Sequence, residues 1–484
     1  MAVVGVDIGT QSLKVVVVDD ALATRGTAAT GYGVDHPRPG WVQQDPVLWE
    51  EALAPTVAAA LERAGVRPDE VRGVGVAGQL DGCVAVGEGG VAIGPCLIWM
   101  DKRAEVPPLP DDFRERTGVT ADPSHMGPKV RWLLTRAAGM ERARFHQPVS
   151  YLVERLTGAF VFDHGLASTT MMYALASRDL DPDLCARFGV ERARLPAVAE
   201  ASSAAGVLTA DGARLSGLPA GTPVAVGTGD DFATPLGAGL VRPGPAVCVL
   251  GTAEVVGALC DRPAIDPGGL VQTHGYVTAG TYFIENPGWL AGGAVAWARR
   301  LLGAADDQEL DAWAAAAPPG SGGVTFLPAL AGAMAPEWQA GARGCFYGLT
   351  AAHERGHLAR AVLEGCAFAM RDVVDRLVVL GVPADPVVLV GGGSRSRVWA
   401  QIRADLLGRP VEVSRVADAC PLGAALLGAV AAGVTSDLAG AAARVGGARD
   451  PVAPDRKAKP AMDDAYRRYR ALFDALRPLF EKNN

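Results

Sequence analysis

The sequence lacks an excess of positive charge. Its 484 residues include 45 lysines and arginines against 53 aspartates and glutamates, a formal net charge of -8 at pH 7. Such a balance gives no general electrostatic attraction for nucleic acid or for an anionic membrane surface. We therefore expect neither as a partner. If the ligand is a nucleotide, Mg²⁺ and backbone N–H groups must supply the positive charge.

Cysteines are few, and no two of them form a C-x-x-C motif. The eight cysteines also show no regular spacing, which indicates reduced, mostly buried thiols in a cytoplasmic protein. The first residues lack a basic segment, and Asp7 interrupts their short apolar run. This pattern predicts a strand and not a signal peptide.

Long hydrophobic runs are nearly absent. The one uncharged stretch of membrane-spanning length, residues 419–436, is rich in alanine and glycine and contains Pro421. Transfer of such a segment to lipid would gain little, so we expect a buried helix that packs closely on a sheet.

Two common nucleotide-binding motifs are missing as well. No G-x-x-x-x-G-K-[ST] spacing surrounds Lys14, and no G-x-G-x-x-G joins a strand to a helix. These absences disfavour the P-loop and dinucleotide-binding folds. There is also no short-period repeat.

What the sequence does contain is a pair of similar glycine turns. Residues 3–8 form an apolar run that is broken at Gly9-Thr10 and continues at 15–19, and residues 246–250 are broken at Gly251-Thr252 in the same way. Each pattern predicts a tight β-hairpin. Glycine lets backbone N–H groups approach a ligand closely, so two such turns facing each other could hold a polyphosphate. Two ordinary hairpins are the alternative.

The rest of the chain alternates strand-like and helix-like segments. An apolar fraction of 49% and a charged fraction of 20% are ordinary for a soluble globular enzyme with a large core. The turn at 242–245 is the candidate boundary between an N-terminal domain, 1–241, and a C-terminal domain, 242–484. We expect a mobile surface loop at 437–460, strands at 71–76, 92–100, 223–227 and 386–390, and helices at 126–138, 288–302, 310–317, 350–380 and 463–480.

Two aspartates stand where ligand chemistry could occur. Asp7 ends the first strand beside the first turn, where it could hold a hydrated Mg²⁺ or simply satisfy backbone N–H groups of the turn. Asp230 follows Gly227-Thr228-Gly229. It suits a general base that takes a proton from an attacking hydroxyl, and a helix N-cap is the alternative. Asp231 is a candidate substrate contact.

A triple glycine and a histidine pair complete the motifs. Gly391, Gly392 and Gly393 lie between a predicted strand and helix and could form a platform for a nucleotide base. His353-Glu354-Arg355-Gly356-His357 matches the zinc motif H-E-x-x-H. No third ligand follows it, so capping or surface histidines are the preferred interpretation.

Taken in order, these residues resemble the FGGY carbohydrate kinases, in the superfamily of hexokinase and actin, with the closest likeness to xylulokinases. The resemblance covers almost the whole chain. Its motifs are Asp7-Ile8-Gly9-Thr10, Gly78-Gln79, Ile98-Trp99 with Asp101 and Arg103, Gly229-Asp230, Leu250-Gly251-Thr252, Phe326-Leu327-Pro328, Ala342-Arg343-Gly344, Glu364-Gly365, Gly391 to Ser396 and Leu422-Gly423-Ala424-Ala425.

The resemblance implies an α/β fold of two ribonuclease-H-like domains around a central cleft, with ATP and Mg²⁺ as cofactors. Asp230 then corresponds to the catalytic base, and Asp7 to a magnesium contact through water. The implied substrate contacts are Gln79, Leu80, Asp81, Trp99, Arg103 and Asp231. The implied ATP and phosphate contacts are Gly9, Thr10, Gln11, Ser12, Gly251, Thr252, Gly292, Gly391, Gly392, Gly393 and Ser394.

The expected reaction is phosphorylation of a terminal hydroxyl of a small ketose, with D-xylulose first. Two positions depart from xylulokinases, which carry Met-His where this chain has Leu80-Asp81 and Asn where it has Asp231. Glycerol kinases carry an acidic residue at the position of Asp81, so a polyol kinase is the second hypothesis. A non-catalytic ATP-binding member of the superfamily is the third. A homodimer is the expected assembly.

Overall fold

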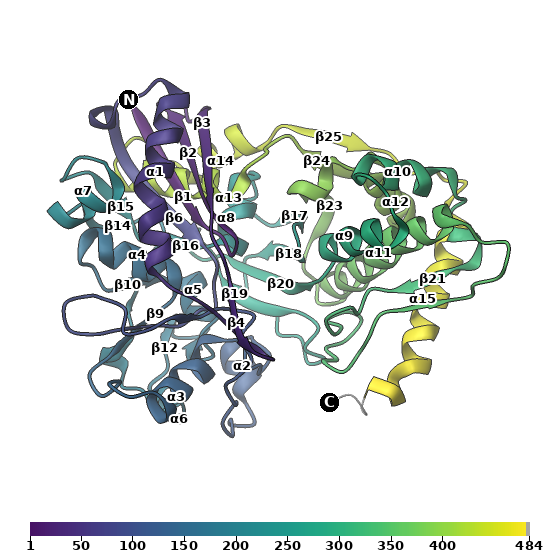
Figure 1. Ribbon diagram of the computed structural model, residues 1–484, viewed down its shortest axis with the longest axis horizontal. Coiled ribbons are helices and arrows are strands. Elements are labelled where there is room, and N and C mark those ends of the chain that lie inside the picture. Colours follow the sequence, from purple (N-terminus) through teal and green to yellow (C-terminus); the bar gives the residue numbers. More distant parts are fainter. Residues whose placement is uncertain (481–484) are drawn as a thin grey trace.

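The computed structural model describes residues 1–480 and shows two α/β halves, each built on a seven-stranded mixed sheet. Figure 1 shows the first half in purple and blue beside the second half in green. The predicted fold class is confirmed.

The first sheet has the order β14-β15-β6-β1-β2-β3, with β16 paired to β6. Strands β1 and β2 form an antiparallel hairpin, and β6 runs parallel to β1. All seven residues of β1 are buried, as expected for a central strand covered on both faces. The strands are β1 (Ala2–Ile8), β2 (Ser12–Asp19), β3 (Thr24–Gly31), β6 (Val71–Gly78), β14 (Ala204–Val207), β15 (Pro223–Ala225) and β16 (Thr228–Gly229).

The second sheet repeats this plan in the order β19-β20-β18-β17-β23-β24-β25. Strands β17 and β18 form the second hairpin, and β23 runs parallel to β17. Both predicted hairpins are therefore confirmed, and the two halves share one architecture. The strands are β17 (Gly244–Leu250), β18 (Glu254–Cys260), β19 (Gln272–Gly275), β20 (Tyr282–Trp289), β23 (Ala384–Val390), β24 (Val411–Ser414) and β25 (Arg449–Val452).

Helices cover both sheets, and small two- and three-stranded sheets complete the fold. The helices of the first half are α1 (Val47–Ala64), α2 (Phe113–Thr117), α3 (Met126–Arg136), α4 (Pro148–Thr157), α5 (His164–Ser168), α6 (Pro182–Arg187), α7 (Ala210–Ser216) and α8 (Asp230–Gly237). Those of the second are α9 (Gly292–Leu302), α10 (Asp307–Ala316), α11 (Arg355–Val379), α12 (Arg397–Leu407), α13 (Ala419–Ala431), α14 (Leu438–Gly446) and α15 (Lys459–Phe480). The minor sheets contain β4 (Asp35–Arg38), β5 (Trp41–Gln44), β7 (Val84–Val86), β8 (Cys96–Leu97), β9 (Arg144–His146), β10 (Val161–Asp163), β11 (Tyr173–Ala174), β12 (Asp179–Leu180), β13 (Ala197–Ala199), β21 (Thr325–Leu327) and β22 (Cys345–Tyr347).

The buried helix expected within 419–436 is α13, and it packs on the sheet of the other half. It contacts α8, β6 and β1, and Figure 1 shows it in yellow-green against the purple strands. A Cβ on Gly75 would lie 1.7 Å from the Ala424 carbonyl oxygen, and one on Gly5 would lie 2.0 Å from that of Pro421. Small residues on both surfaces therefore let helix and sheet backbones meet directly.

Four expected elements differ from the structure. Only Cys96–Leu97 of the expected strand 92–100 is a strand. The helix expected from 288 begins at Gly292, because β20 extends to Trp289. The helix expected from 350 begins at Arg355. The expected loop 437–460 contains α14 and β25, since Ala441 and Ala442 are buried and β25 pairs with β24.

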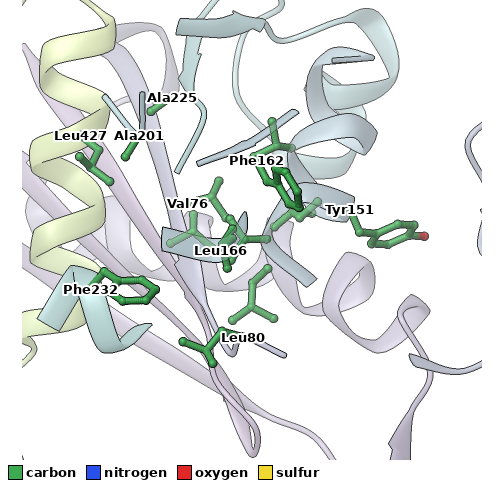
Figure 2. Close-up of a cluster of buried hydrophobic side chains, with 14 of the residues drawn as sticks. Val76, Leu80, Tyr151, Phe162, Leu166, Ala201, Ala225, Phe232 and Leu427 are labelled. Carbon is green, nitrogen blue, oxygen red and sulfur yellow. The ribbon is translucent and has the colours of Figure 1, made fainter. Parts of the chain in front are cut away.

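Hydrophobic side chains from both sides of the first sheet meet in one core. Figure 2 shows Leu80 and Phe232 at the lower end of this cluster, with Leu166 and Val76 above them. All eight cysteines are free thiols, as predicted, and six are buried. Within residues 1–480, no helix combines the length and apolarity needed to cross a membrane.

Candidate active site

The first glycine turn is held by one backbone hydrogen bond and by two side chains from other segments. Gly9 N donates to Ser12 O at 3.0 Å, which closes the turn that includes Gln11. Trp99 Nε1 donates to Thr10 Oγ1 at 3.0 Å, and Gln44 Nε2 donates to Thr10 O at 2.6 Å. The Thr10 hydroxyl thus accepts from Trp99 and keeps its own proton available to a ligand.

The second glycine turn meets two other predicted ligand segments. Gly251 N donates to Ala253 O at 3.0 Å. Gly292, the first residue of α9, comes so close that a Cβ there would lie 2.2 Å from Gly251 O. Since the N-terminus of a helix attracts anions, this junction is suited to phosphate.

The triple glycine lies on the other side of the same turn. Gly391 has φ +90°, and a Cβ there would lie 2.9 Å from Leu250 O. Ser394 Oγ donates to Gly391 O at 2.7 Å, so Gly392 and Gly393 lie in a closed 3₁₀ turn. The structure therefore brings together Gly251, Thr252, Gly292 and residues 391–394.

Asp7 lies on β1, opposite Lys14 of β2. Its carboxylate is buried, and its Oδ1 has no hydrogen-bond partner within the described residues. Burial and the charge of Asp230 raise the pKa of Asp7 to about 7. A buried carboxylate oxygen without a protein partner is available to a cation or its water shell.

Asp230 and Asp231 open α8, whose N-cap is Gly229. Asp230 is therefore inside the helix, and the alternative role as N-cap is excluded. Burial, assisted by the charge of Asp81, raises the pKa of Asp230 to about 6 although backbone N–H groups donate to it. Burial and the charges of Asp230 and Asp81 raise the pKa of Asp231 well above its usual range.

Asp81 is fixed by three neighbours that sequence reasoning missed. It has the strained φ of +61°. Its N–H donates to Gln147 Oε1 at 2.8 Å, its carbonyl accepts from Lys129 Nζ at 2.8 Å, and its Oδ1 lies 3.0 Å from His125 Nδ1. Burial opposes a charge on His125, but the Asp81 carboxylate outweighs it and raises the pKa of His125.

Both missed cations are almost fully buried. Burial lowers the pKa of Lys129, which lies on the apolar face of α3. The sequence signal for Lys129 was a lysine on the apolar face of the predicted helix 126–138. Lysine is seldom buried without a specific partner, so this position indicates a buried ion pair or hydrogen bond. Nothing in the sequence near His125 indicates its pairing with Asp81.

The other predicted substrate residues differ in whether they have a polar atom available to a ligand. Gln79 Nε2 donates to Gln44 Oε1 at 2.9 Å, while its buried Oε1 has no partner in residues 1–480. Trp99 is partly exposed, and its indole N–H is used by Thr10. Leu80 points into the core of Figure 2, so its side chain is not displayed to a ligand.

The guanidinium of Arg103 makes its hydrogen bonds to other side chains of the protein. Its Nε donates to both oxygens of the buried Asp101, at 3.0 and 2.8 Å, and its Nη2 donates to Gln43 at 2.9 Å. The guanidinium also stacks on Trp41, 3.8 Å from the ring centroid. This arrangement orders the loop that carries Trp99.

The H-E-x-x-H motif acts as a cap. His353 precedes α11, and its Nδ1 accepts from Thr350 N at 2.8 Å. His357 Nδ1 accepts from Glu354 N at 3.1 Å. No cluster of three metal-ligating side chains occurs in the part of the chain that the structure describes.

Comparison with known proteins agrees with this geometry. The sequence model of the N-terminal domain of the FGGY family of carbohydrate kinases matches residues 2–237, and that of the C-terminal domain matches residues 246–432. A glycerol kinase from Alkalilimnicola ehrlichii is 34% identical over 460 residues, 90% of each chain. A xylulose kinase from Escherichia coli is 30% identical over 441 residues, 89% of this chain and 90% of the relative. A solved structure from Brucella ovis, titled as a "xyloylose kinase", has a TM-score of 0.90 and 31% identity over 99% of this chain and 100% of its own.

Proposed function

Because this chain belongs to the FGGY family of carbohydrate kinases, we propose that it transfers the γ-phosphoryl group of ATP to a terminal hydroxyl of a small ketose, D-xylulose in the first place. As a member of this family it is a phosphotransferase with an alcohol group as acceptor. The observation that supports the reaction best is the position of Asp230, a carboxylate at the start of α8 beside Asp7 and Asp81.

Asp230 is suited to act as the general base. A pKa of about 6 leaves it mostly ionised at neutral pH, yet basic enough to accept a proton. The terminal hydroxyl oxygen attacks the γ-phosphorus, and its proton passes to Asp230. The bond from phosphorus to the bridging oxygen of ADP breaks, and ADP leaves with that electron pair.

The two glycine turns would hold the phosphates from opposite sides. Gly9, Thr10, Gln11 and Ser12 offer donors from the first half. Gly251, Thr252 and the N-terminus of α9 at Gly292 offer them from the second, with residues 391–394 beside them. Donors fixed in this way stabilise charge without reorganisation at the moment of transfer.

The residues present fit a hydrated Mg²⁺ at Asp7, since Asp7 Oδ1 is buried and has no partner within residues 1–480. When bound, Mg²⁺ would neutralise phosphate charge. Ionised Asp7 would accept hydrogen bonds from the water shell of the ion. Lys14, opposite Asp7, favours that ionised form.

A polyol is the second candidate acceptor, and Asp81 favours it. The Asp81 carboxylate, paired with His125, accepts hydrogen bonds, which suits hydroxyl groups better than a ketone oxygen. The relatives include both glycerol kinases and xylulose kinases, so they do not decide between the two acceptor classes.

The test is ADP release from Mg-ATP with D-xylulose, L- and D-ribulose, xylitol, ribitol, erythritol and glycerol. Stimulation by D-xylulose above the alditols is the expected result. Higher kcat/KM with an alditol would establish the second candidate instead. If none stimulates ADP release, the chain is a non-catalytic member and the proposal is wrong. The expected homodimer stays a prediction, which a measurement of the molar mass in solution by light scattering would test.

A further inference from the structure

A group of four buried side chains on the second half, three of them polar, lies against α8, the helix that begins with Asp230 and Asp231. Strands β19 and β20 pair with Gln272 opposite Glu285 and His274 opposite Phe283. Opposite residues of an antiparallel pair share a face, and alternate residues of one strand do too. These four side chains therefore form one patch, here called the β19–β20 patch.

The patch is fixed against α8 by aromatic contacts. Phe232 lies 6.1 Å from Phe283 and 5.7 Å from His274, measured between ring centroids. Phe232 directly follows Asp231. Burial and the charges of Asp231, Asp81 and Asp230 all raise the pKa of Glu285 well above its usual range. Glu285 is thus close enough to the three aspartates of the first half to feel their charge.

The patch also holds polar atoms that the protein leaves unpaired. Glu285 and Gln272 are each only 1% exposed. Yet Glu285 Oε2 and both amide atoms of Gln272 find no hydrogen-bond partner among residues 1–480. Buried polar atoms without partners are costly unless a ligand satisfies them.

The hydrogen bonds around His274 define the state of Glu285. Ser168 Oγ donates to Gly165 O at 2.6 Å, so it must accept from His274 Nδ1, 3.2 Å away. Burial lowers the pKa of His274 to about 3, so its ring is neutral. Nε2 is then an acceptor 3.5 Å from Glu285 Oε1. That separation is too long for a good hydrogen bond, so a protonated Glu285 keeps its proton available and can donate it from the unpaired Oε2.

We propose that Glu285 is a specificity-determining residue, which donates a hydrogen bond to an oxygen of the sugar or polyol from the side opposite Asp81 and Asp231. This inference rests on the proposed function, because it places the acceptor between the aspartates and the β19–β20 patch. The second half then contributes to acceptor binding as well as to ATP binding. No other donor that we assign to the acceptor comes from that half.

The test compares Glu285→Met with Glu285→Gln. Methionine keeps the length and removes the hydrogen bond, whereas glutamine keeps a donor. Replacement of a buried ionisable group by an apolar one of similar shape is not expected to unfold the protein. With the acceptor that serves the wild type best, we expect Glu285→Met to lower kcat/KM about 10- to 100-fold, mainly through KM. Glu285→Gln should stay within about 5-fold of wild type.

Glu364→Gln is the control for loss of a buried carboxylate of the same half that is already paired: Glu364 accepts from Gly320 N, Ser321 Oγ and Arg360 Nε at 2.9, 2.8 and 2.7 Å, so this variant is expected to lose stability. It should leave the KM for the acceptor unchanged. In the Glu285 variants, ADP affinity and the melting temperature should match those of wild type.

Three results would overturn the inference. They are an unchanged acceptor KM in Glu285→Met, an equal rise of KM in both Glu285 variants, and a parallel loss of ADP affinity. A wild type that no acceptor stimulates would refute the proposed function itself. That outcome is distinct, since each of the other three requires an active wild type.

Discussion

The two hairpins carry buried carboxylates that the protein treats in opposite ways. Asp7, beside the first turn, has an oxygen without a partner in the described structure. Glu254, the first residue after the second turn, has both oxygens bound. Arg403 Nη1 and Nη2 donate to them at 2.6 and 2.8 Å, and Cys248 Sγ donates at 3.0 Å.

The difference indicates two roles for buried carboxylates beside the turns of a repeated hairpin, one before its turn and the other after it. The Glu254–Arg403 pair is buried completely and joins β18 to α12, the helix that follows Gly391–Ser394. It therefore fixes, relative to each other, two segments that we propose bind ATP. Asp7 and Asp230 keep acceptor capacity for ligands and protons. In the proposed mechanism the paired Glu254 positions the site, whereas Asp7 and Asp230 take part in the chemistry.

The largest expected effect is that of Asp230→Asn. Loss of a general base lowers turnover by about 10³-fold or more. ATP affinity should change little, because the amide keeps the shape of the side chain. Steady-state ADP release and calorimetric titration with ADP measure the two quantities. Turnover within 10-fold of wild type would remove Asp230 as the base.

Activity should also follow the ionisation of Asp230. Because its pKa is about 6 in the folded protein, kcat/KM should fall as the pH drops through about 6 and the base becomes protonated. A pH profile between 5 and 8 checks this limb. In Asp230→Asn, the limb should be absent from the residual rate.

Glu254→Gln has the next largest expected effect, and it tests the carboxylate that is paired with Arg403. It leaves the buried Arg403 charge without its counterion, which costs about 3–5 kcal/mol of unfolding free energy. Denaturant titration measures this loss. Combining Glu254→Leu with Arg403→Met should recover much of it, because no unpaired charge remains. A silent Glu254→Gln would contradict the positioning role.

Asp7→Asn tests the unpaired carboxylate. Its effect on the free energy of unfolding should be opposite in sign to that of Glu254→Gln. Loss of the proposed contact to the water shell of Mg²⁺ should lower activity about 10- to 100-fold and raise the Mg²⁺ requirement. Stability should rise instead of falling, since the variant no longer buries an ionisable carboxyl. A magnesium titration of the ADP release rate, with chelator as the zero point, gives the first effect.

The stability effect of Asp7→Asn depends on pH in a defined direction. The pKa of Asp7 is about 7 when folded and 3.8 when unfolded. Between these values the folded state holds a proton that the unfolded state releases, so wild-type unfolding free energy falls as the pH rises. The variant should match wild type near pH 4 and exceed it by up to about 4 kcal/mol at pH 8. Equal stability at both pH values would contradict a buried, unpaired Asp7.

The sequence predicts the parts of the site that local patterns encode. Gly9-Thr10 and Gly251-Thr252 are recognisable because a hairpin turn needs glycine between apolar runs, and Asp230 because it ends a strand in a glycine-rich loop. The structure confirms both hairpins and the two-part fold. The assigned roles of these residues stay predictions, which the variants above test.

The missed residues are those brought in by packing between distant segments. His125 meets Asp81 from 44 residues away, and Arg403 meets Glu254 from 149 residues away. No local periodicity encodes such pairs. The segment 437–460 was misjudged for a related reason. Its composition resembles a loop, but burial of Ala441 and pairing of β25 with β24 order it.

Asp81 lies between the two cases, since one oxygen is paired with His125 and the other has no contact in the described residues that fixes it. Asp81→His should therefore have the smallest effect, a shift of about 10-fold in the ratio of kcat/KM for D-xylulose over xylitol. A neutral histidine can donate to a ketone oxygen, whereas a carboxylate only accepts. The substitution also removes the counterion of His125, so the charged form of His125 would no longer be favoured. Acceptor-independent ATP hydrolysis, measured in the same variant, is the control for a general change of the site. An unchanged ratio would mean that Asp81, like Glu254, positions its neighbours and does not select the acceptor.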